Sequence, residues 1–415
     1  MNSLFSILSW VRNHEIKMYF LYISLMFLPL NMNLNNIFLV VFMIIHLIEG
    51  GYRTKIAQVL KHLNKILPIT LLFLIIALGF FYSEFKGNAL KQIERSIPFL
   101  TIPIIFLSQP VLFSKRKNHI FYSLVLGCLF ATLICWINLA VTLINNDEVY
   151  RLFTWEYSRL NLIKPLDQHT AYLSLFVLTS VGFLVSMLRV KKDKFRVTQI
   201  IVTVVLITFL MHMLSRTAIA YFIICTILYF IVKKKYVFLF GFIASIGLFV
   251  SVLLNNSADK SDFFKRLLVE QVGIEGDERA DGRFKRWKYS WQLFKENPIF
   301  GTGTGDADIL RTIKYRENAD IYAYKQRYNA HNQFFEFLSA QGVFGALLFL
   351  YCFGYLLNLT YKHKDYLFLY IISGVVVCCI TESMFRRSWG FVFFAIMGSL
   401  LIVSTVNINM LNRNK

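Results

Sequence analysis

The chain has 415 residues, of which 56% are hydrophobic and 16% are charged, and its formal net charge is +20. A soluble globular protein is about 45–50% apolar and about 25% charged. This composition excludes a cytoplasmic enzyme, a disordered chain and a secreted disulfide scaffold. In a chain this apolar, an excess of basic residues indicates cytoplasmic loops and an anionic substrate, so we expect no nucleic acid partner.

Apolar stretches that could cross a bilayer occur about twelve times. A spanning helix needs about 20 mostly apolar residues. The sequence therefore predicts an all-α polytopic membrane protein with about twelve transmembrane helices. No small-residue cleavage site follows the first stretch, so we expect no removable signal peptide. The predicted spans lie near residues 17–33, 35–50, 66–83, 97–109, 120–144, 170–188, 197–214, 218–232, 236–254, 334–359, 367–383 and 391–406.

Basic residues in the loops predict the orientation of these spans. When the N-terminus is placed inside, the short inside loops hold 21 of the 44 Lys and Arg residues and the short outside loops hold 9. Because cytoplasmic loops are enriched in Lys and Arg, we expect both termini in the cytoplasm. The prediction divides the chain into N-terminal membrane helices (1–254), a long periplasmic helical loop (255–333) and C-terminal membrane helices (334–415).

The long segment has three notable stretches, and loops of this length are usually functional. Residues 262–272 have apolar side chains at helical spacing, which suits a helix lying on a membrane surface. Residues 283–296 predict a second helix with aromatic residues on one face, capped by Asp281 and ended by Pro298. Alternate glycines in 301–305 let the backbone pass close to a phosphate or to another helix.

Four arginines are candidates for binding an anion, because a guanidinium holds phosphate through two parallel donors. Arg216 lies in a tight hairpin between two predicted spans, and Arg95 precedes another span. Arg283 and Arg286 share one side of the predicted outer helix. The alternatives are a snorkelling interfacial residue for Arg216, a solvated loop for Arg95 and a solvated helix face for the other two.

Two histidines are placed where proton transfer would be useful. His331 lies where the long segment enters the next span, and there an imidazole could take a proton from a sugar hydroxyl. The alternative is a helix-capping cluster in which His331 merely packs. His169 enters another span and is a second candidate, whereas His212 is interpreted as a core histidine. The predicted substrate-binding residues are Arg286, Arg95, His169 and Asn332.

The sequence gives no sign of a cofactor. The six cysteines lie in apolar runs, and no group of His, Cys, Asp or Glu has the spacing of a metal site. The glycine-rich stretch follows no strand and lacks the lysine of a P-loop. We therefore expect neither a metal nor a nucleotide cofactor.

A combination of motifs over about residues 205–350 resembles the superfamily of O-antigen ligases and O-antigen polymerases. A Ser-Arg hairpin is followed by a long outer loop, which carries a Gly-Arg pair, a glycine-rich stretch and an Ala-His-Asn stretch. The stretches that carry the resemblance are Ser215-Arg216, Gly282-Arg283 with Trp287, Asn297 to Gly303, Ala330-His331-Asn332, Gln333 to Glu336 and Gly342 to Gly345.

The resemblance implies a fold of the membrane glycosyltransferase C type in a bacterial inner membrane. It also implies that a glycan on undecaprenyl diphosphate passes to an acceptor sugar at the periplasmic face without a metal. By resemblance, Arg216 and Arg283 would hold the diphosphate, and His331 would serve or position the acceptor. Arg286 is a second candidate for the phosphate partner.

The resemblance leaves three functions open. A ligase would transfer a finished glycan to lipid A–core, and a polymerase would transfer it to a growing glycan. The ligase is favoured because the matched loop segments are the better-known ligase ones. A transporter or flippase of polyprenyl-linked sugars would show inverted repeats and broken helices, and the sequence indicates neither.

Overall fold

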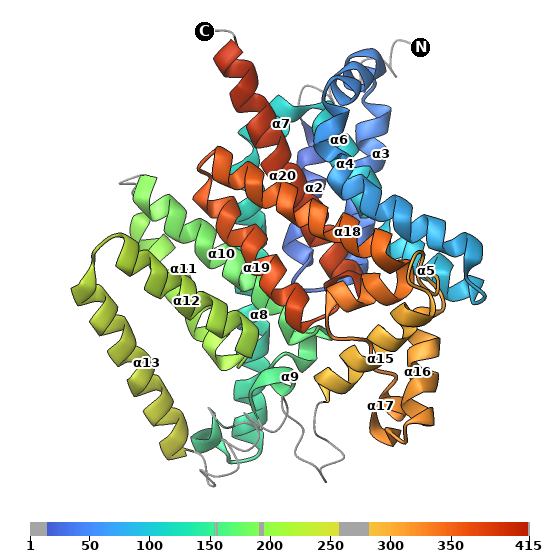
Figure 1. Ribbon diagram of the computed structural model, residues 1–415. Coiled ribbons are helices and arrows are strands. Elements are labelled where there is room, and N and C mark those ends of the chain that lie inside the picture. The colour runs from blue at the N-terminus through green and yellow to red at the C-terminus, as the bar shows by residue number, and fades with distance from the viewer. Residues whose placement is uncertain (1–14, 153, 155–156, 191–194, 257–281, 414–415) are drawn as a thin grey trace.

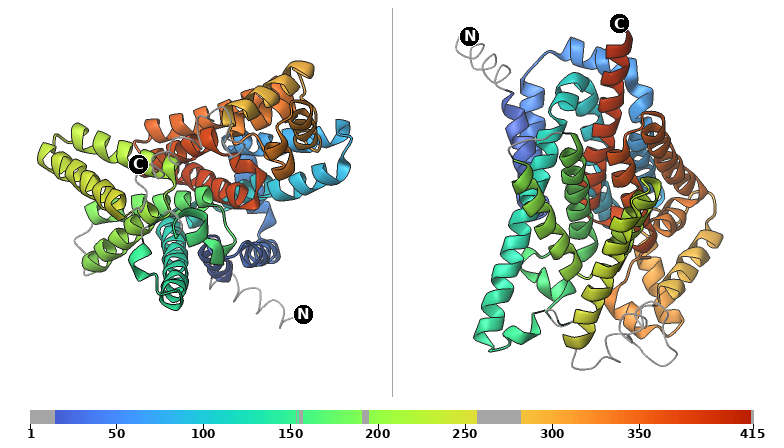
Figure 2. Two further views of the ribbon diagram at one scale, coloured as in Figure 1. Left: turned by 90° about the horizontal axis from the view of Figure 1, so that it is seen from below. Right: turned by 90° about the vertical axis from the view of Figure 1, so that its left-hand side faces the viewer.

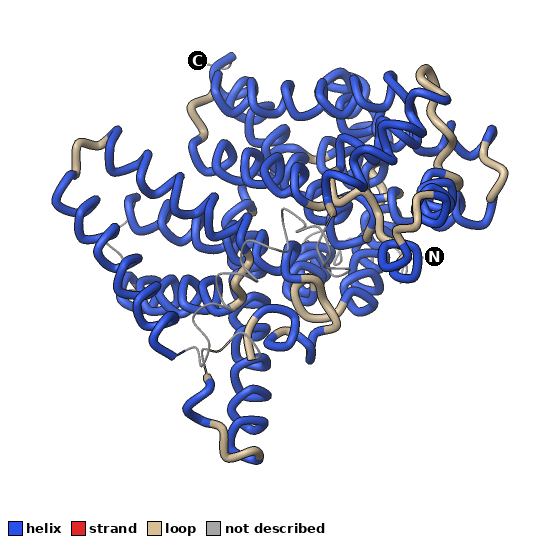
Figure 3. Tube along the Cα trace, turned by 60° about the horizontal axis from the view of Figure 1, so that its bottom comes forward, coloured by secondary structure: helices blue, strands red, loops and turns tan. Residues whose placement is uncertain are grey.

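The computed structural model describes residues 15–152, 154, 157–190, 195–256 and 282–413, and these residues form helices joined by turns and loops (Figures 1 and 3). No strand occurs among these described residues. The all-α prediction is therefore confirmed for this part of the chain.

The N-terminal part of the chain contributes most of the helices. They are α2 (Ile16–Phe27), α3 (Met32–Ile48), α4 (Tyr52–Tyr82), α5 (Lys86–Ser96), α6 (Pro98–Ser108), α7 (Pro110–Lys115), α8 (Lys117–Asn145), η1 (Val149–Arg151), α9 (Arg159–Leu162), η2 (Lys164–Leu166), α10 (Thr170–Val190), α11 (Arg196–His212), α12 (Arg216–Val232) and α13 (Tyr236–Asn256).

The C-terminal part adds three helices of the long segment and then three apolar helices. They are α15 (Arg283–Glu296), α16 (Ala307–Glu317), α17 (Ile321–Gln326), α18 (Gln333–Lys362), α19 (Tyr366–Thr381), η3 (Met384–Arg386) and α20 (Ser388–Arg413). The helix predicted at 283–296 is confirmed as α15. The helix predicted at 262–272 lies outside the described residues. So does Asp281, the predicted cap of the helix at 283–296.

Each of the twelve predicted spans overlaps one of these helices, and the chain has the helical character of a multi-pass membrane protein. Within the described ranges, five helices are long and apolar enough to cross a membrane by themselves. They are Tyr52–Tyr82, Lys117–Asn145, Thr170–Leu188, Gln333–Lys362 and Ser388–Ile408. Six further apolar helices are shorter, so the number of twelve spans stays a prediction.

Two predicted boundaries differ from the structure. Helix α4 begins at Tyr52, so the stretch expected as an inside loop at 51–65 is helical, with a kink at His62. The first span ends at Phe27, because a short turn follows and Asn31 caps α3 by accepting a hydrogen bond from the Leu34 amide at 3.0 Å. The N-cap at Asn31 starts a second helix within the stretch that hydropathy alone predicted as one span.

The apolar core lies around α20, which is the most completely buried of the five long helices. This helix packs against α6, α7 and α4. The Phe99 ring of α6 lies 4.8 Å from Phe391 and 5.7 Å from Phe394, measured between ring centroids. Figures 1 and 2 place α15–α17 at one end of the helix bundle and the end of α20 at the other.

Helix α18 is interrupted at Gly342, where φ is 64° and ψ is −158°. The glycine-rich stretch docks into the break: the amides of Thr302 and Gly303 donate to the carbonyls of Ser339 and Ala340, each at 2.9 Å, and the Val343 amide donates to the Pro298 carbonyl at 2.9 Å. The sequence left open whether the glycines let the backbone pass close to a phosphate or to another helix. The structure shows that the backbone passes close to a helix, α18. The sequence indicated no broken helix and the structure shows one, because these partners lie some 40 residues away in sequence and leave no hydropathy signal.

Gly342→Ala should lower the melting temperature of the detergent-solubilised protein. An added Cβ would lie 2.3 Å from the Ile299 carbonyl oxygen, and the backbone conformation is one that only glycine adopts readily. Strain of this kind costs about 1–3 kcal/mol before any clash is counted. Gly354→Ala in the same helix is the control, since a Cβ there meets nothing within 4 Å. Equal melting temperatures for both variants would contradict the account of the break.

Candidate active site

His331 lies just before α18, and its ring contacts an acidic residue from a distant part of the chain. The Nδ1 atom is 3.1 Å from Oε2 of Glu382, which directly follows the last residue of α19. The His331 side chain is 16% exposed, so the ring is not sealed in the apolar core. Because Nδ1 faces a carboxylate, Nε2 is the nitrogen positioned to act as a base.

The Glu382 carboxyl is held in its charged form. Burial by itself would raise its pKa, but the hydrogen bond and charge of His331, together with the charges of His169 and Arg283, lower the pKa to about 2. A carboxylate with this pKa stays ionised across the physiological range. Glu382 can therefore orient the His331 ring and stabilise its protonated form.

The lowered pKa predicts how Glu382 contributes to stability at different pH values. A carboxyl whose pKa is depressed on folding stabilises the native state above its ordinary pKa of about 4.3 and loses that contribution as the pH falls toward the folded value. The difference in melting temperature between the wild type and Glu382→Gln should thus still be present at pH 5 and shrink as the pH falls from about 4.3 toward about 2. A difference that disappears already between pH 8 and pH 6 would contradict the assigned ionisation.

Arg216 is the first residue of α12, and both of its neighbours in sequence contact other helices at this end. The Ser215 Oγ atom is 2.9 Å from the Ser174 Oγ atom in the first turns of α10. The Thr217 Oγ1 atom is 2.9 Å from the Thr381 Oγ1 atom at the end of α19. Since Thr381 precedes Glu382, these contacts bring Arg216 to the region of the His331–Glu382 pair.

Arg283 and His169 belong to the same region. Arg283 begins α15, and its charge acts on Glu382. His169 precedes α10, and burial lowers its pKa, while the charges of Glu382, Arg387 and His331 act on it as well. The predicted residues Arg216, Arg283, His331 and His169 therefore converge on one end of the bundle, around Glu382.

His212 has a different environment, as the sequence predicted. Its side chain is buried, Trp136 Nε1 donates to its Nδ1 at 3.2 Å, and its Nε2 is 3.1 Å from the Leu152 carbonyl oxygen. The prediction of a core histidine is confirmed.

Arg286 does not lie on a solvated face of α15, which was the alternative that the sequence pattern allowed. The residue is buried, with 4% exposure, and its guanidinium carbon is 3.8 Å from the centroid of the Tyr328 ring. The aromatic residues Phe284 and Trp291 are instead exposed by 66% and 45%. The interpretation of Arg286 as part of a solvated face is wrong, because α15 turns its polar face toward α16 and α18.

Arg95 and Asn332 make contacts that support the backbone around the site. Arg95 is exposed on α5 and donates from Nη1 to the Arg386 carbonyl at 3.2 Å. Asn332 caps α18 by accepting from the Phe334 and Phe335 amides, and its Nδ2 donates to the Ile380 carbonyl at 3.0 Å. Substrate binding by either residue stays a prediction, and the geometry favours a positioning role for both.

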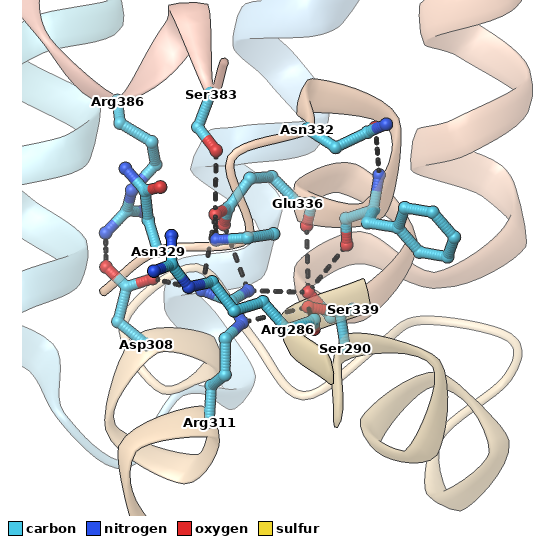
Figure 4. Close-up of polar contacts among 12 residues, drawn as sticks. Arg286, Ser290, Asp308, Arg311, Asn329, Asn332, Glu336, Ser339, Ser383 and Arg386 are labelled. Atoms are coloured by element: carbon cyan, nitrogen blue, oxygen red, sulfur yellow. Dashed lines mark hydrogen bonds and ion pairs between the residues drawn. The ribbon is translucent and has the colours of Figure 1, made fainter. Parts of the chain in front are cut away.

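The sequence interpretation missed a buried ionic network next to this site (Figure 4). Arg311 is fully buried and binds Glu336 through two parallel contacts, Nη1–Oε1 at 3.2 Å and Nη2–Oε2 at 3.1 Å. Its Nε donates to the Ser290 hydroxyl at 2.9 Å, and its Nη1 donates to Asp308 Oδ1 at 2.9 Å. This network ties α15, α16 and α18 together.

The same network reaches the segment that carries Glu382. The Ser383 hydroxyl donates to Glu336 Oε1 at 3.0 Å, and Arg386 forms an ion pair with Asp308. Glu336 and Glu382 both had a usable signal in the sequence, because each is a carboxylate at the edge of an otherwise apolar run. Arg311 had none, since it lies in a segment rich in charges of both signs.

Comparison with known proteins agrees with the location of these residues. A search of curated proteins found no match to the chain. Residues 201–350 match the family model described as O-antigen ligase, a stretch that runs from α11 into α18. Arg216, Arg283 and His331 all lie within this stretch, and so does the break at Gly342. Residues 201–350 are therefore similar to the O-antigen ligase family.

Proposed function

We propose that the protein is a membrane glycosyltransferase that moves an undecaprenyl-diphosphate-linked glycan to an acceptor sugar, as an O-antigen ligase that joins O-antigen to lipid A–core. The observation that carries the proposal is the pairing of His331 with Glu382 at 3.1 Å, at the bundle end to which Arg216 and Arg283 also belong. A base and two guanidinium groups at one place are what this transfer requires.

The reaction follows from the charges of these groups. The acceptor hydroxyl attacks the anomeric carbon of the glycan, and Nε2 of His331 takes the hydroxyl proton. The bond between the anomeric carbon and the diphosphate oxygen breaks, and undecaprenyl diphosphate leaves with the electron pair. Arg216 and Arg283 stabilise the negative charge that gathers on this leaving group. Glu382 stabilises the imidazolium that forms on His331.

The proposal also includes a membrane orientation. The site is at the bundle end that carries α15–α17, and the basic residues of the loops predict this end as the periplasmic one. Both termini would lie in the cytoplasm of a bacterium, with the protein in the inner membrane. In whole cells, an impermeant thiol reagent should label Lys325→Cys in α17 and leave Lys233→Cys, after α12, unlabelled. Labelling of Lys233→Cys alone would show that the orientation is the reverse of the one proposed.

The function is tested with purified protein in proteoliposomes, given a labelled undecaprenyl-diphosphate-linked glycan together with lipid A–core. A ligase forms glycan-capped lipid A–core and releases one undecaprenyl diphosphate for each transfer. Longer polyprenyl-linked glycans made from donor alone would identify a polymerase instead. Movement of intact donor across the bilayer without bond cleavage would identify a transporter and overturn the proposal. Transfer should persist in EDTA, because the arginines supply the positive charge.

A further inference from the structure

Arg286 is a buried cation whose guanidinium lies against an aromatic ring. The guanidinium carbon is 3.8 Å from the Tyr328 ring centroid, well within the range of a cation–π interaction, and Arg286 itself is 4% exposed. A desolvated guanidinium on a ring face holds the ring more firmly than an exposed one does. The orientation of the Tyr328 ring is thus coupled to Arg286.

Tyr328 in turn lies against the proposed base. The ring centroids of Tyr328 and His331 are 5.7 Å apart, and the ring planes are inclined at 69°, which is an edge-to-face arrangement. The backbone of Tyr328 is held separately, because the Tyr315 hydroxyl donates to its carbonyl at 3.1 Å. The Tyr328 ring therefore contacts Arg286 and His331 while its backbone is fixed.

Two side-chain contacts bear on the orientation of the His331 ring, apart from the contacts that hold its backbone. Its φ is 46°, in the left-handed region, and it lies outside the regular hydrogen bonding of α18. Its amide donates to the Asn329 side chain at 2.9 Å, and its ring has Glu382 at Nδ1 and Tyr328 beside it. The imidazole thus lies between two side chains, with Glu382 at Nδ1 and the Tyr328 ring beside it.

We propose that Arg286 is a positioning residue that acts through Tyr328 to hold the His331 ring against Glu382, and that it is not a ligand of the donor diphosphate. The inference rests on the proposed function of His331 as the base. It assigns distinct roles to two arginines one turn apart on α15: Arg283 serves the leaving group, and Arg286 serves the base.

A double-mutant cycle on the purified protein tests this assignment. Arg286→Met and Tyr328→Leu should each lower kcat by about 10- to 100-fold, the scale for removing the partners that orient a metal-binding histidine. The KM for the donor should stay within about twofold of the wild type, and the double variant should be no slower than the worse single one. Tyr328→Phe keeps the ring and should keep most of the activity. Lys288→Met removes an exposed cation from the same helix and is the matched control.

A second measurement does not depend on glycan transfer. The rate of diethyl pyrocarbonate modification at His331, followed by peptide mass spectrometry, should rise severalfold in Arg286→Met and in Tyr328→Leu and stay unchanged in Lys288→Met. If the modification rates rise but His331→Ala still transfers glycan, the positioning holds and the proposed function fails. The positioning itself is overturned if Arg286→Met leaves the His331 modification rate unchanged, or if it mainly raises the donor KM while Tyr328→Leu is fully active.

Discussion

His331→Ala is expected to lower the rate of glycan transfer by about 10²- to 10⁴-fold, the usual contribution of a general base. The donor should still bind, because Arg216 and Arg283 are unchanged. The imidazole is suited to this role by its hydrogen bond to Glu382, whose pKa is lowered to about 2 and which therefore remains an ionised partner. Transfer assays and donor-binding assays on the same protein preparation separate the two effects.

The variant His331→Gln distinguishes proton transfer from positioning. Glutamine can donate and accept hydrogen bonds but cannot take a proton at neutral pH. Measurable residual transfer by His331→Gln, well above that of His331→Ala, would indicate that orienting the acceptor hydroxyl supplies much of the effect. Near-normal transfer by His331→Ala would remove His331 from the mechanism altogether.

Arg216→Ala and Arg283→Ala are each expected to lower the transfer rate by about 10²- to 10³-fold, the scale for removing one preorganised donor from a site of developing charge. Arg216→Lys should also be poor, because lysine keeps the charge but cannot form the planar two-donor contact with phosphate. The measurement is initial transfer rate at matched protein levels in the membrane, with melting temperatures to confirm folding.

Arg286→Met provides the contrast for these two variants. Arg286→Met should reduce kcat with little change in the KM for the donor. Arg283→Ala should reduce kcat and also raise the KM for the donor. If Arg283→Ala transfers normally and Arg286→Met no longer binds donor, the assignment of roles to the two arginines is reversed. This comparison is informative because both residues lie on α15 and differ in burial.

Much of the helical architecture could be predicted from the sequence, because the signal is local. The apolar runs coincide with helices, and the helix predicted at 283–296 is observed at those residues. Its end depends on the adjacent Asn297 and Pro298, which act through local backbone chemistry. Predictions of where helices form thus agreed with the structure, although the end of the first span and the start of α4 were placed wrongly.

The discrepancies arise where distant segments decide the outcome. The break in α18 at Gly342 depends on hydrogen bonds from residues near 300. On the inward polar face of α15, Ser290 accepts a hydrogen bond from Arg311 of α16, which in turn binds Glu336 of α18. Glu382 is 51 residues from His331 in sequence, so their pairing could not be predicted from either local stretch. The arginine and histidine candidates could be named from sequence, but their shared acidic partner required the fold.

The most direct test of the account is a cryo-electron microscopy structure of the protein in a lipid nanodisc with bound undecaprenyl diphosphate. We expect phosphate oxygens within about 3 Å of the guanidinium nitrogens of Arg216 and Arg283, the hydrogen-bonding range for such pairs. Nε2 of His331 should face the space next to the diphosphate, with Nδ1 still on Glu382 and Arg286 still on Tyr328. A diphosphate bound away from both Arg216 and Arg283, or a His331 ring turned away from it, would contradict the central claim that these residues form one active site.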